Sequence, residues 1–262
     1  MHFFYCDHFV LPLPEEHRFP MAKYALLRDR VAASEIGGKG SMQVPPAAND
    51  AELGLVHEGE YLRKVREGDL SPMEIRRMGF PWSSELVERS RRSVGGTMEA
   101  GRAALKDGVA VNLSGGTHHA FPDRGEGFCV FNDVAVATRV LQREGRARRV
   151  AILDLDVHQG NGTAAIFAED SSVFTLSVHG ANNFPFRKEE SDLDLELPDN
   201  AADGPYLDQV RMGVAQALEA SAPELAFFVA GADPFSGDRL GRLQVSKEAL
   251  RARDRIVFEE CR

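Results

Sequence analysis

Three side chains of types that bind metals occur at every second position near the middle of the chain. Asp154, Asp156 and His158 end an apolar run that begins at Val150. Because side chains alternate between the two faces of a strand, these three would share one face. The run before them is apolar on both faces, as in a parallel strand buried between helices, where a carboxylate is costly unless it is paired or binds a metal. The spacing therefore predicts a metal site at the carboxyl end of this strand.

A third metal ligand is offered by Asp233, which follows another short apolar run. A catalytic zinc usually has three protein ligands and one open position for water, and Asp156, His158 and Asp233 would supply those three. Two carboxylates and a neutral imidazole leave the centre with little net charge, yet able to acidify water and polarise a carbonyl. Alone, Asp233 could equally be a turn former before Pro234. Together with the other two residues, it is interpreted as a ligand.

Two adjacent histidines, His118 and His119, follow a Gly-Gly turn. A glycine-rich turn can direct both rings into one cleft, which a regular strand could not do. One imidazole could take a proton from water on the metal, while the other stabilises charge on a substrate or protonates a leaving amine. Each ring needs an orienting partner, and we expect Asp154 to orient one and Asn161 the other.

The elements that must position these residues are indicated by short apolar runs that alternate with segments of helical period. Helical spacing covers residues 87–105 and 207–218. The runs with strand character are Val109–Leu113, Val150–Leu155, Val173–Val178 and Leu225–Ala230. Such alternation predicts a three-layer α/β fold, with a mostly parallel sheet and helices on both faces. The candidate side chains lie at strand carboxyl ends, so we expect one shared cleft. Residues 37–50 and 185–205 are predicted to be surface loops.

The overall composition is that of an ordinary globular protein. The chain has 262 residues, of which 43% are hydrophobic and 27% charged, and we expect a single domain over residues 1–262. No apolar run approaches the roughly 20 residues of a membrane span, and the N-terminus does not resemble a signal peptide. We therefore expect a cytoplasmic protein that does not enter membranes.

Cysteine content and charge narrow the range of partners. The cysteines are Cys6, Cys129 and Cys261, which are widely spaced and predict neither a disulfide framework nor a thiolate zinc site. The net charge of -9 disfavours direct nucleic acid binding and mildly favours a cationic substrate, although acidity also simply aids solubility.

Four motifs, taken in order, resemble the zinc-dependent histone deacetylase and acetylpolyamine amidohydrolase superfamily. The motifs are Ser114–Ala120, Gly127–Asp133, Asp154–Thr163, and Ala230–Pro234 with Gly237–Gly241. The run from Ser177 to Phe186 is most similar to the bacterial, class IV-like branch. A single motif would be weak, but four in order make chance similarity very improbable. The resemblance implies the fold shared by arginases and these deacetylases.

Residue roles follow from the resemblance position by position. It implies one zinc ion at Asp156, His158 and Asp233, with Asp154 as the partner of His118 and Asn161 beside His119. It also implies a narrow tunnel for the acyl-lysine side chain, walled by Gly127, Phe128 and Phe184. Finally, it implies a structural monovalent cation, K⁺ or Na⁺, held by Asp154, the main-chain carbonyls of Asp156 and His158, Ser177 and Val178.

One feature of the family is missing from this sequence. Members of the family carry a Gly-Gly-Tyr segment after the stretch that corresponds to Gly237–Gly241, and its tyrosine hydroxyl polarises the substrate carbonyl. The sequence ends at Arg262 before any such segment, so we expect the domain to lack a final strand and helix. A fragment is favoured over a naturally curtailed enzyme, because residues 246–262 read as a helix without a terminating Gly or Pro.

The expected function is zinc-dependent removal of acetyl or another short acyl group from lysine side chains or related amines. One alternative is a catalytically weak module that binds acyl-lysine or polyamine. A binuclear manganese ureohydrolase is disfavoured, because two metals would need more acidic or histidine ligands where the sequence has Gln159 and Asn161. Acyl length, carrier amine and oligomeric state are left open.

Overall fold

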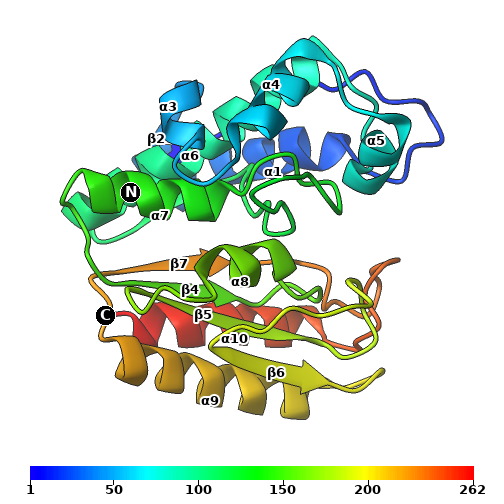
Figure 1. Cartoon of the computed structure of the whole chain (residues 1–262). Coiled ribbons are helices and arrows are strands. Elements are labelled where there is room, and N and C mark those ends of the chain that lie inside the picture. The colour runs from blue at the N-terminus through cyan, green and yellow to red at the C-terminus, as the bar shows by residue number, and fades with distance from the viewer. The chain divides into compact units, whose positions relative to one another are not determined.

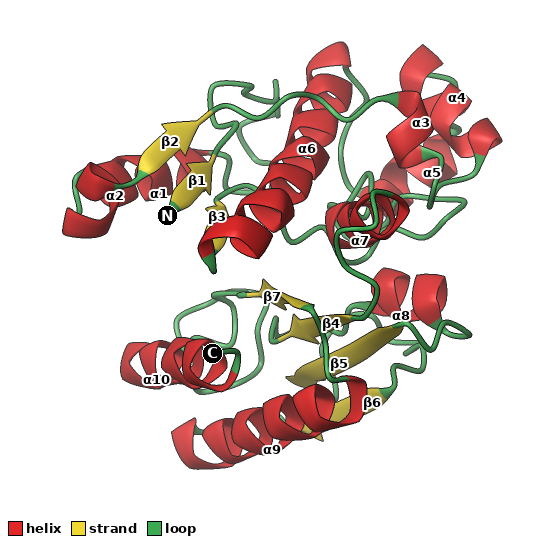
Figure 2. Cartoon of the chain, turned by 90° about the vertical axis from the view of Figure 1, so that its left-hand side faces the viewer, coloured by secondary structure: helices red, strands yellow, loops and turns green.

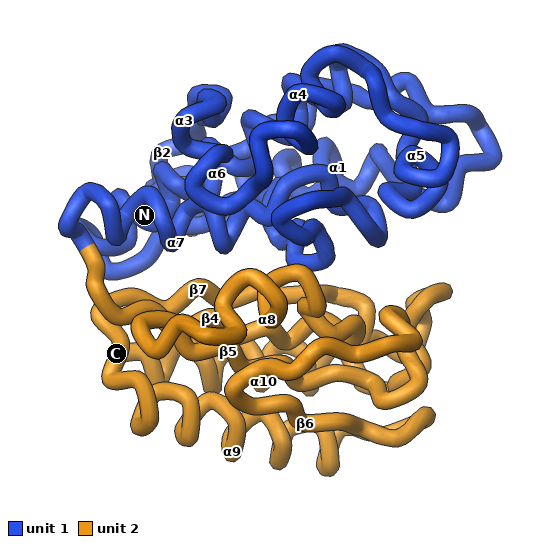
Figure 3. Tube along the Cα trace, viewed as in Figure 1, with its two compact units in different colours: residues 1–146 blue, residues 147–262 orange.

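The computed structural model describes residues 1–262. The chain forms two compact units, residues 1–146 and residues 147–262, which are described separately (Figure 3). No helix in either unit combines the length and apolar character needed to cross a membrane. The expectation of a single catalytic domain stays a prediction.

The first unit contains most of the helices (Figure 1) and a small parallel sheet (Figure 2). Its elements are β1 (His2–Phe4), α1 (Ala22–Ala32), α2 (Glu35–Lys39), β2 (Ser41–Gln43), α3 (Asp50–Leu53), α4 (Gly59–Glu67), α5 (Pro72–Met78), α6 (Ser84–Asp107), β3 (Ala110–Asn112) and α7 (Asp133–Arg143). The strand order is β2-β1-β3, with His2 paired to Ser41 on one side and Ala110 on the other.

Capping side chains determine where several of these helices begin. Ser71 and Glu74 form a reciprocal capping box at α5, which ends at the left-handed Gly79. The Ser83 side chain caps α6, and Asn132 caps α7. The long helix α6 packs against α7, β1 and β3, so it connects the small sheet to the helical part of the unit.

The second unit is a four-stranded parallel sheet with helices on both faces. Its elements are β4 (Val150–Asp154), α8 (Asn161–Phe167), β5 (Val173–Gly180), β6 (Leu193–Leu197), α9 (Asp203–Ser221), β7 (Leu225–Val229) and α10 (Lys247–Glu260). The strand order is β6-β5-β4-β7. Helices α9 and α10 cover one face, and α8 lies on the other (Figure 2). All pairs are parallel, so the carboxyl ends of the strands lie at one edge of the sheet.

The central strand β4 is buried at every position, which explains its continuous apolar sequence. Leu153, Leu155 and Leu176 pack with the buried face of α9, where Tyr206 and Val210 are fully buried. Burial of a large aliphatic side chain contributes roughly 1.5–3 kcal/mol. The ends of β4 and its neighbours are therefore anchored by a well-packed core.

The predicted α/β class, with parallel strands and helices on both faces, is confirmed. All four apolar runs form strands, β3, β4, β5 and β7, and both helical segments form helices, α6 and α9. However, β3 pairs with β1 and not with the β4 sheet.

Both predicted surface loops are wrong in part. Residues 37–50 include β2, which is only three residues long and gains its hydrogen bonds from β1. Residues 185–205 include β6 and the start of α9. The acidic residues of β6 alternate with Leu193, Leu195 and Leu197, so the strand packs one leucine row on the core and directs Asp194 and Glu196 to the opposite face.

Candidate metal centre and histidine pair

The predicted ligand strand ends earlier than its sequence spacing suggests. Asp154 is the last residue of β4, so Asp156 and His158 lie in the segment that follows rather than on a regular strand face. The backbone still runs beside β7 at this point, because the Leu155 amide donates to the Val229 carbonyl at 3.1 Å. The amide of Asp156 donates to Oδ1 of Asp154 at 3.2 Å. Side-chain acceptors thus replace the sheet ladder and shape this segment.

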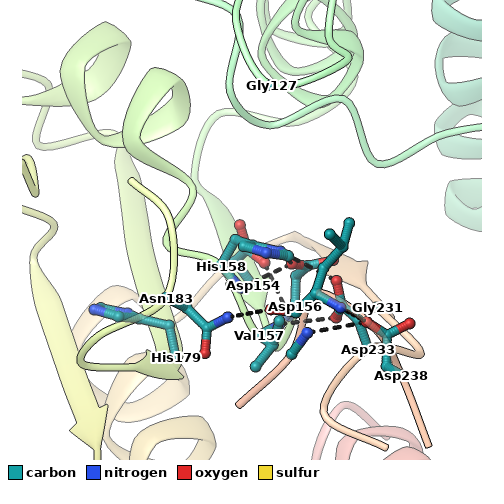
Figure 4. Close-up of polar contacts among 12 residues, drawn as sticks. Gly127, Asp154, Asp156, Val157, His158, His179, Asn183, Gly231, Asp233 and Asp238 are labelled. Atoms are coloured by element: carbon teal, nitrogen blue, oxygen red, sulfur yellow. Dashed lines mark hydrogen bonds and ion pairs between the residues drawn. The ribbon is translucent and has the colours of Figure 1, made fainter. Parts of the chain in front are cut away.

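Asp156, His158 and Asp233 converge on one point at the carboxyl edge of the second unit's sheet (Figure 4). Their ligand-type atoms all lie within 4.8 Å of one another. Nδ1 of His158 is 2.9 Å from Oδ1 of Asp156 and 3.1 Å from Oδ2 of Asp233. Two carboxylate oxygens and one imidazole nitrogen form a donor set that suits zinc. The arrangement fits the predicted metal, and the role of these residues as ligands stays a prediction.

Backbone contacts fix both carboxylates. Oδ1 of Asp233 accepts the Val157 amide at 3.0 Å, and Oδ1 of Asp156 accepts the His158 amide at 2.9 Å. The two ligand segments also touch directly, because a Cβ added to Gly231 would lie 2.3 Å from Oδ2 of Asp156 and 2.7 Å from its Cα. Only glycine allows this approach between the ends of β4 and β7.

The electrostatics of the centre favour a positive charge between the carboxylates. Burial opposes the charged form of His158, but hydrogen bonds to Asp156 and Asp233 and their charges outweigh it and raise the pKa of His158 to about 10. Burial and the charge of Asp156 raise the pKa of Asp233, and His158 opposes that shift. A metal ion and a proton therefore compete for Nδ1 of His158.

The histidine pair lies in the first unit. The rings of His118 and His119 are adjacent, with centroids 4.1 Å apart and planes inclined by 42°, and each residue is 4% exposed. The turn before them is held by Asp133, whose Oδ1 accepts the Thr117 amide at 2.8 Å and the Thr117 hydroxyl at 2.7 Å. Its Oδ2 accepts the Gly116 amide at 3.1 Å. The buried carboxylate of Asp133 thus holds the turn from the N-terminus of α7.

Asn132 extends this support to the other side of the histidine pair. Its side-chain amide donates to the carbonyls of His118 and Ala120, while its Oδ1 caps α7. The Asn132 backbone amide donates to Nε2 of His57, so the other nitrogen of that ring donates to the Phe121 carbonyl at 3.0 Å. Burial lowers the pKa of His57 to about 4, which keeps the ring neutral. These roles were not predicted from the sequence, although Asn132 before a helical segment is a recognisable N-cap.

The predicted orienting residues lie in the second unit. Asp154 and Asn161 are 3% and 2% exposed, at the end of β4 and the start of α8. Their pairing with His118 and His119 stays a prediction.

The predicted monovalent cation site falls in the same unit. Asp154 lies opposite Ser177 in the ladder between β4 and β5, and Val178 follows Ser177 in β5. The Ser177 hydroxyl is 2.9 Å from Nδ1 of the fully buried His179. The register brings two of the predicted cation ligands together, and cation binding stays a prediction.

Of the predicted tunnel residues, Phe184 lies at the candidate metal centre. Its ring is 6.4 Å from that of His158, in an edge-on arrangement. The segment is held by Asn183, which donates to the Leu240 carbonyl at 2.9 Å, and by Lys188, whose ammonium donates to the carbonyls of Asn183 and Pro185.

The other tunnel residues, Gly127 and Phe128, belong to the first unit. Both have positive φ angles, and their amides donate to the carbonyls of Arg77 and Met78. The Phe128 ring packs among Phe19 and Phe80. A shared tunnel with Phe184 stays a prediction.

Known proteins resemble this chain over most of its length. A protein of Picosynechococcus, itself uncharacterised, is 45% identical over 98% of this chain and 86% of its own length. Histone deacetylase 2 of Arabidopsis thaliana is 29% identical over 94% of this chain, and the acetoin utilization protein AcuC of Bacillus subtilis is 32% identical over 66%. This chain spans 66% and 47% of the lengths of those two relatives.

Solved structures agree with this relationship. A homologue of histone deacetylases in complex with SAHA aligns with a TM-score of 0.83 and 26% identity, over 99% of this chain and 76% of its own. The HD domain of HDA15 aligns with a TM-score of 0.84 over 100% of this chain and 82% of its own, and at 23% identity it supports the fold alone. The histone deacetylase domain model itself matches residues 17–262. The chain therefore belongs to the histone deacetylase family.

Proposed function

We propose that this chain is a zinc-dependent amidohydrolase that removes acetyl or another short acyl group from lysine side chains or related amines. Membership of the histone deacetylase family supports hydrolysis of an amide. The observation that carries the proposal is the convergence of Asp156, His158 and Asp233 at the carboxyl edge of a parallel sheet, where such folds bind their ligands.

One zinc ion per chain would be held by Asp156, His158 and Asp233. Bound there, zinc would lower the pKa of a water molecule and polarise an amide carbonyl. The chain itself supplies a rigid frame, because each carboxylate already accepts a backbone amide with one oxygen. Asp154, Ser177 and Val178, with the carbonyls of Asp156 and His158, would hold a structural K⁺ or Na⁺ beside it.

Proton transfer is assigned to His118 and His119. One ring would take a proton from the attacking water, and the other would give a proton to the departing amine. Asp154 would keep the His118 ring protonated on one nitrogen and more basic, since a carboxylate favours the cationic form of an imidazole, and Asn161 would orient His119 without adding charge.

The substrate side chain would run between aromatic walls. Phe184 lies beside His158, and Phe128 with Gly127 would form the facing wall. Apolar rings suit the four methylene groups of a lysine side chain. The net charge of -9 is compatible with a substrate that releases a cationic amine. We propose a cytoplasmic protein without direct binding to nucleic acid.

Metal analysis together with turnover tests the proposal. Asp156→Ala, His158→Ala and Asp233→Ala should each abolish stoichiometric zinc binding, because two remaining protein ligands hold zinc poorly. His119→Ala should retain zinc and slow hydrolysis of an acetyl-lysine peptide by roughly 10²-fold or more. Asp208→Ala, at an exposed position of α9, is the control for the ligand variants, and His8→Ala, at another exposed position, is the control for His119→Ala.

Each result has a defined meaning. Full zinc content in any of the three ligand variants removes that residue from the proposed metal centre. Wild-type turnover in His119→Ala removes it from proton transfer. If the zinc-loaded protein hydrolyses no acylated amine, the assigned reaction is wrong.

A further inference from the structure

A buried arginine on α10 reaches both segments that carry the candidate carboxylate ligands. Arg253 is 3% exposed. Its Nη1 donates to the carbonyl of Gly231 at 2.5 Å and, at a longer 3.4 Å, to the carbonyl of Leu155. Leu155 directly precedes Asp156, and Gly231 stands two positions before Asp233.

The two carbonyls held by Arg253 belong to segments in direct contact. Gly231 lies so close to Asp156 that no side chain would fit between them (Figure 4). In addition, the Val157 amide bridges to Oδ1 of Asp233. The guanidinium therefore joins the main chain of both segments, which already touch through the Asp156 and Asp233 carboxylates.

The helix that carries Arg253 is itself firmly placed. Ser246 caps α10 by accepting the Ala249 amide at 3.0 Å. The same serine donates its amide and its hydroxyl to the Asp203 carboxylate at the start of α9, both at 2.7 Å. Arg253 thus extends from a fixed base, and the planar guanidinium holds its donors in a defined geometry.

A guanidinium is a costly choice for this position. Its carboxylate partner is Asp254, whose side chain is 42% exposed, and Nε and Nη2 both bond to one oxygen of that group. The Phe228 ring lies 5.3 Å away, and burial keeps Tyr206 a neutral phenol by raising its pKa to about 12. Apolar side chains of similar volume commonly serve stability as well as a buried charge does. The contacts to both ligand segments supply a reason for the arginine.

We propose that Arg253 is a positioning residue that fixes the separation of Asp156 and Asp233 and so sets the affinity and geometry of the metal site. This inference rests on the proposed function. A purely structural arginine would satisfy two carbonyls and stabilise the fold, yet leave the metal affinity of the folded protein unchanged. The two roles therefore differ in a measurable quantity.

The experiment compares Arg253→Met and Arg253→Lys with the unaltered chain. Zinc affinity is measured by competition with a chromophoric chelator, and the visible absorption of the Co²⁺-substituted protein reports ligand geometry. Loss of a group that orients metal ligands typically costs about 10- to 100-fold in affinity, which we expect for methionine. Lysine can reach one carbonyl and should lose less than methionine but more than the control. Both variants should show an altered cobalt spectrum.

Arg149→Met is the control, because the exposed Arg149 also donates to a backbone carbonyl of this unit, that of Ala222, but at the amino ends of β4 and β7, opposite the ligand segments. It should keep wild-type affinity and spectrum. If the methionine variant does not fold, the lysine variant decides. A folded variant of either kind with wild-type zinc affinity and cobalt spectrum overturns the inference while leaving the proposed function intact. Absence of zinc binding in the unaltered chain would overturn the proposed function, and this inference with it.

Discussion

His57 shows how one neutral side chain supports the site from a distance. It accepts the Asn132 amide and donates to the Phe121 carbonyl. It therefore joins the residue two positions after the histidine pair to Asn132, whose side chain donates to the His118 carbonyl. Both contacts require the neutral ring with its proton on Nδ1. The low pKa that burial imposes on His57 therefore serves this geometry.

A defined pH dependence of stability follows from this histidine. Its pKa is about 4 in the folded chain and about 6.5 when unfolded, so the unfolded state binds more protons in between. The contribution of neutral His57 to the free energy of unfolding is fully present above about pH 6.5. It decreases as the pH falls towards 4, and the total loss below that pH is roughly 3 kcal/mol. His57→Asn should be less stable at pH 7 but lose less stability between pH 7 and pH 4.5. Urea unfolding at several pH values measures this difference.

The control for that measurement is His8→Asn, which changes an exposed histidine of the same unit. It should retain the wild-type slope of stability against pH. An equally steep slope in His57→Asn would mean that other groups cause the acid sensitivity.

At the residue scale, the side chains that could be predicted from the sequence are those whose chemistry is visible in their type and spacing. Asp156, His158 and Asp233 were predicted as one cluster, and the structure brings them together. Arg253 was missed because an arginine within a helix gives no indication of where its long side chain ends. Gly231 was missed for a similar reason, since the close approach that excludes a side chain exists only after β4 and β7 pair.

At the scale of elements, the start of α7 is a support for the histidine turn. Asp133 is the first residue of this helix, where the helix dipole favours a negative charge. Its carboxylate accepts hydrogen bonds from Thr117, Gly116 and the Thr97 hydroxyl, and all of these donors are neutral. A fully satisfied buried carboxylate of this kind specifies one loop conformation.

Asp133→Asn should therefore affect the histidine pair more than the metal. The asparagine amide cannot accept the Gly116 amide with its nitrogen, so we expect a stability loss of about 1–3 kcal/mol. Misplacement of the turn should lower turnover of an acetyl-lysine peptide by about 10- to 100-fold at unchanged zinc content. Thr117→Ser keeps the hydroxyl that donates to Asp133, so this variant should retain most of the activity. Thr117→Val removes the hydroxyl and should lower turnover as Asp133→Asn does.

Asp69→Asn, at an exposed position of the same unit, controls for the loss of charge. Normal turnover in a folded Asp133→Asn variant would limit Asp133 to a role in stability.

Helices and strands could be predicted where the apolar run or the helical period lies within the segment itself and does not depend on a distant partner. The buried strands β4 and β5 and the long helices α6 and α9 were found from apolar runs and helical period. Strand β6 could have been found, because Leu193, Leu195 and Leu197 alternate with acidic residues. Strands β1 and β2 have three residues each, so their existence depends on partners distant in sequence.

For the whole molecule, metal binding and folding of the second unit should be linked. The proposed ligands come from the segments that follow β4 and β7, so only the folded sheet would present all three together. Zinc at 100 times its dissociation constant should stabilise the protein by about 2.7 kcal/mol. Chelation should lower the melting temperature, and hydrogen exchange should rise at residues 153–158 and 229–234 before it rises in β1 and β3. Uniform changes in exchange along the chain would show that the metal does not act through this sheet edge.

The pairing of β4 with β7 also has a consequence in time. A ribosome adds about 5–20 residues per second. Asp156 and His158 are therefore synthesised several seconds, on the order of ten, before Asp233. During that interval the nascent chain would offer only two of the three proposed ligands, too few for a tight site. On this proposal, metal would be loaded only after β7 has joined β4 at the sheet edge.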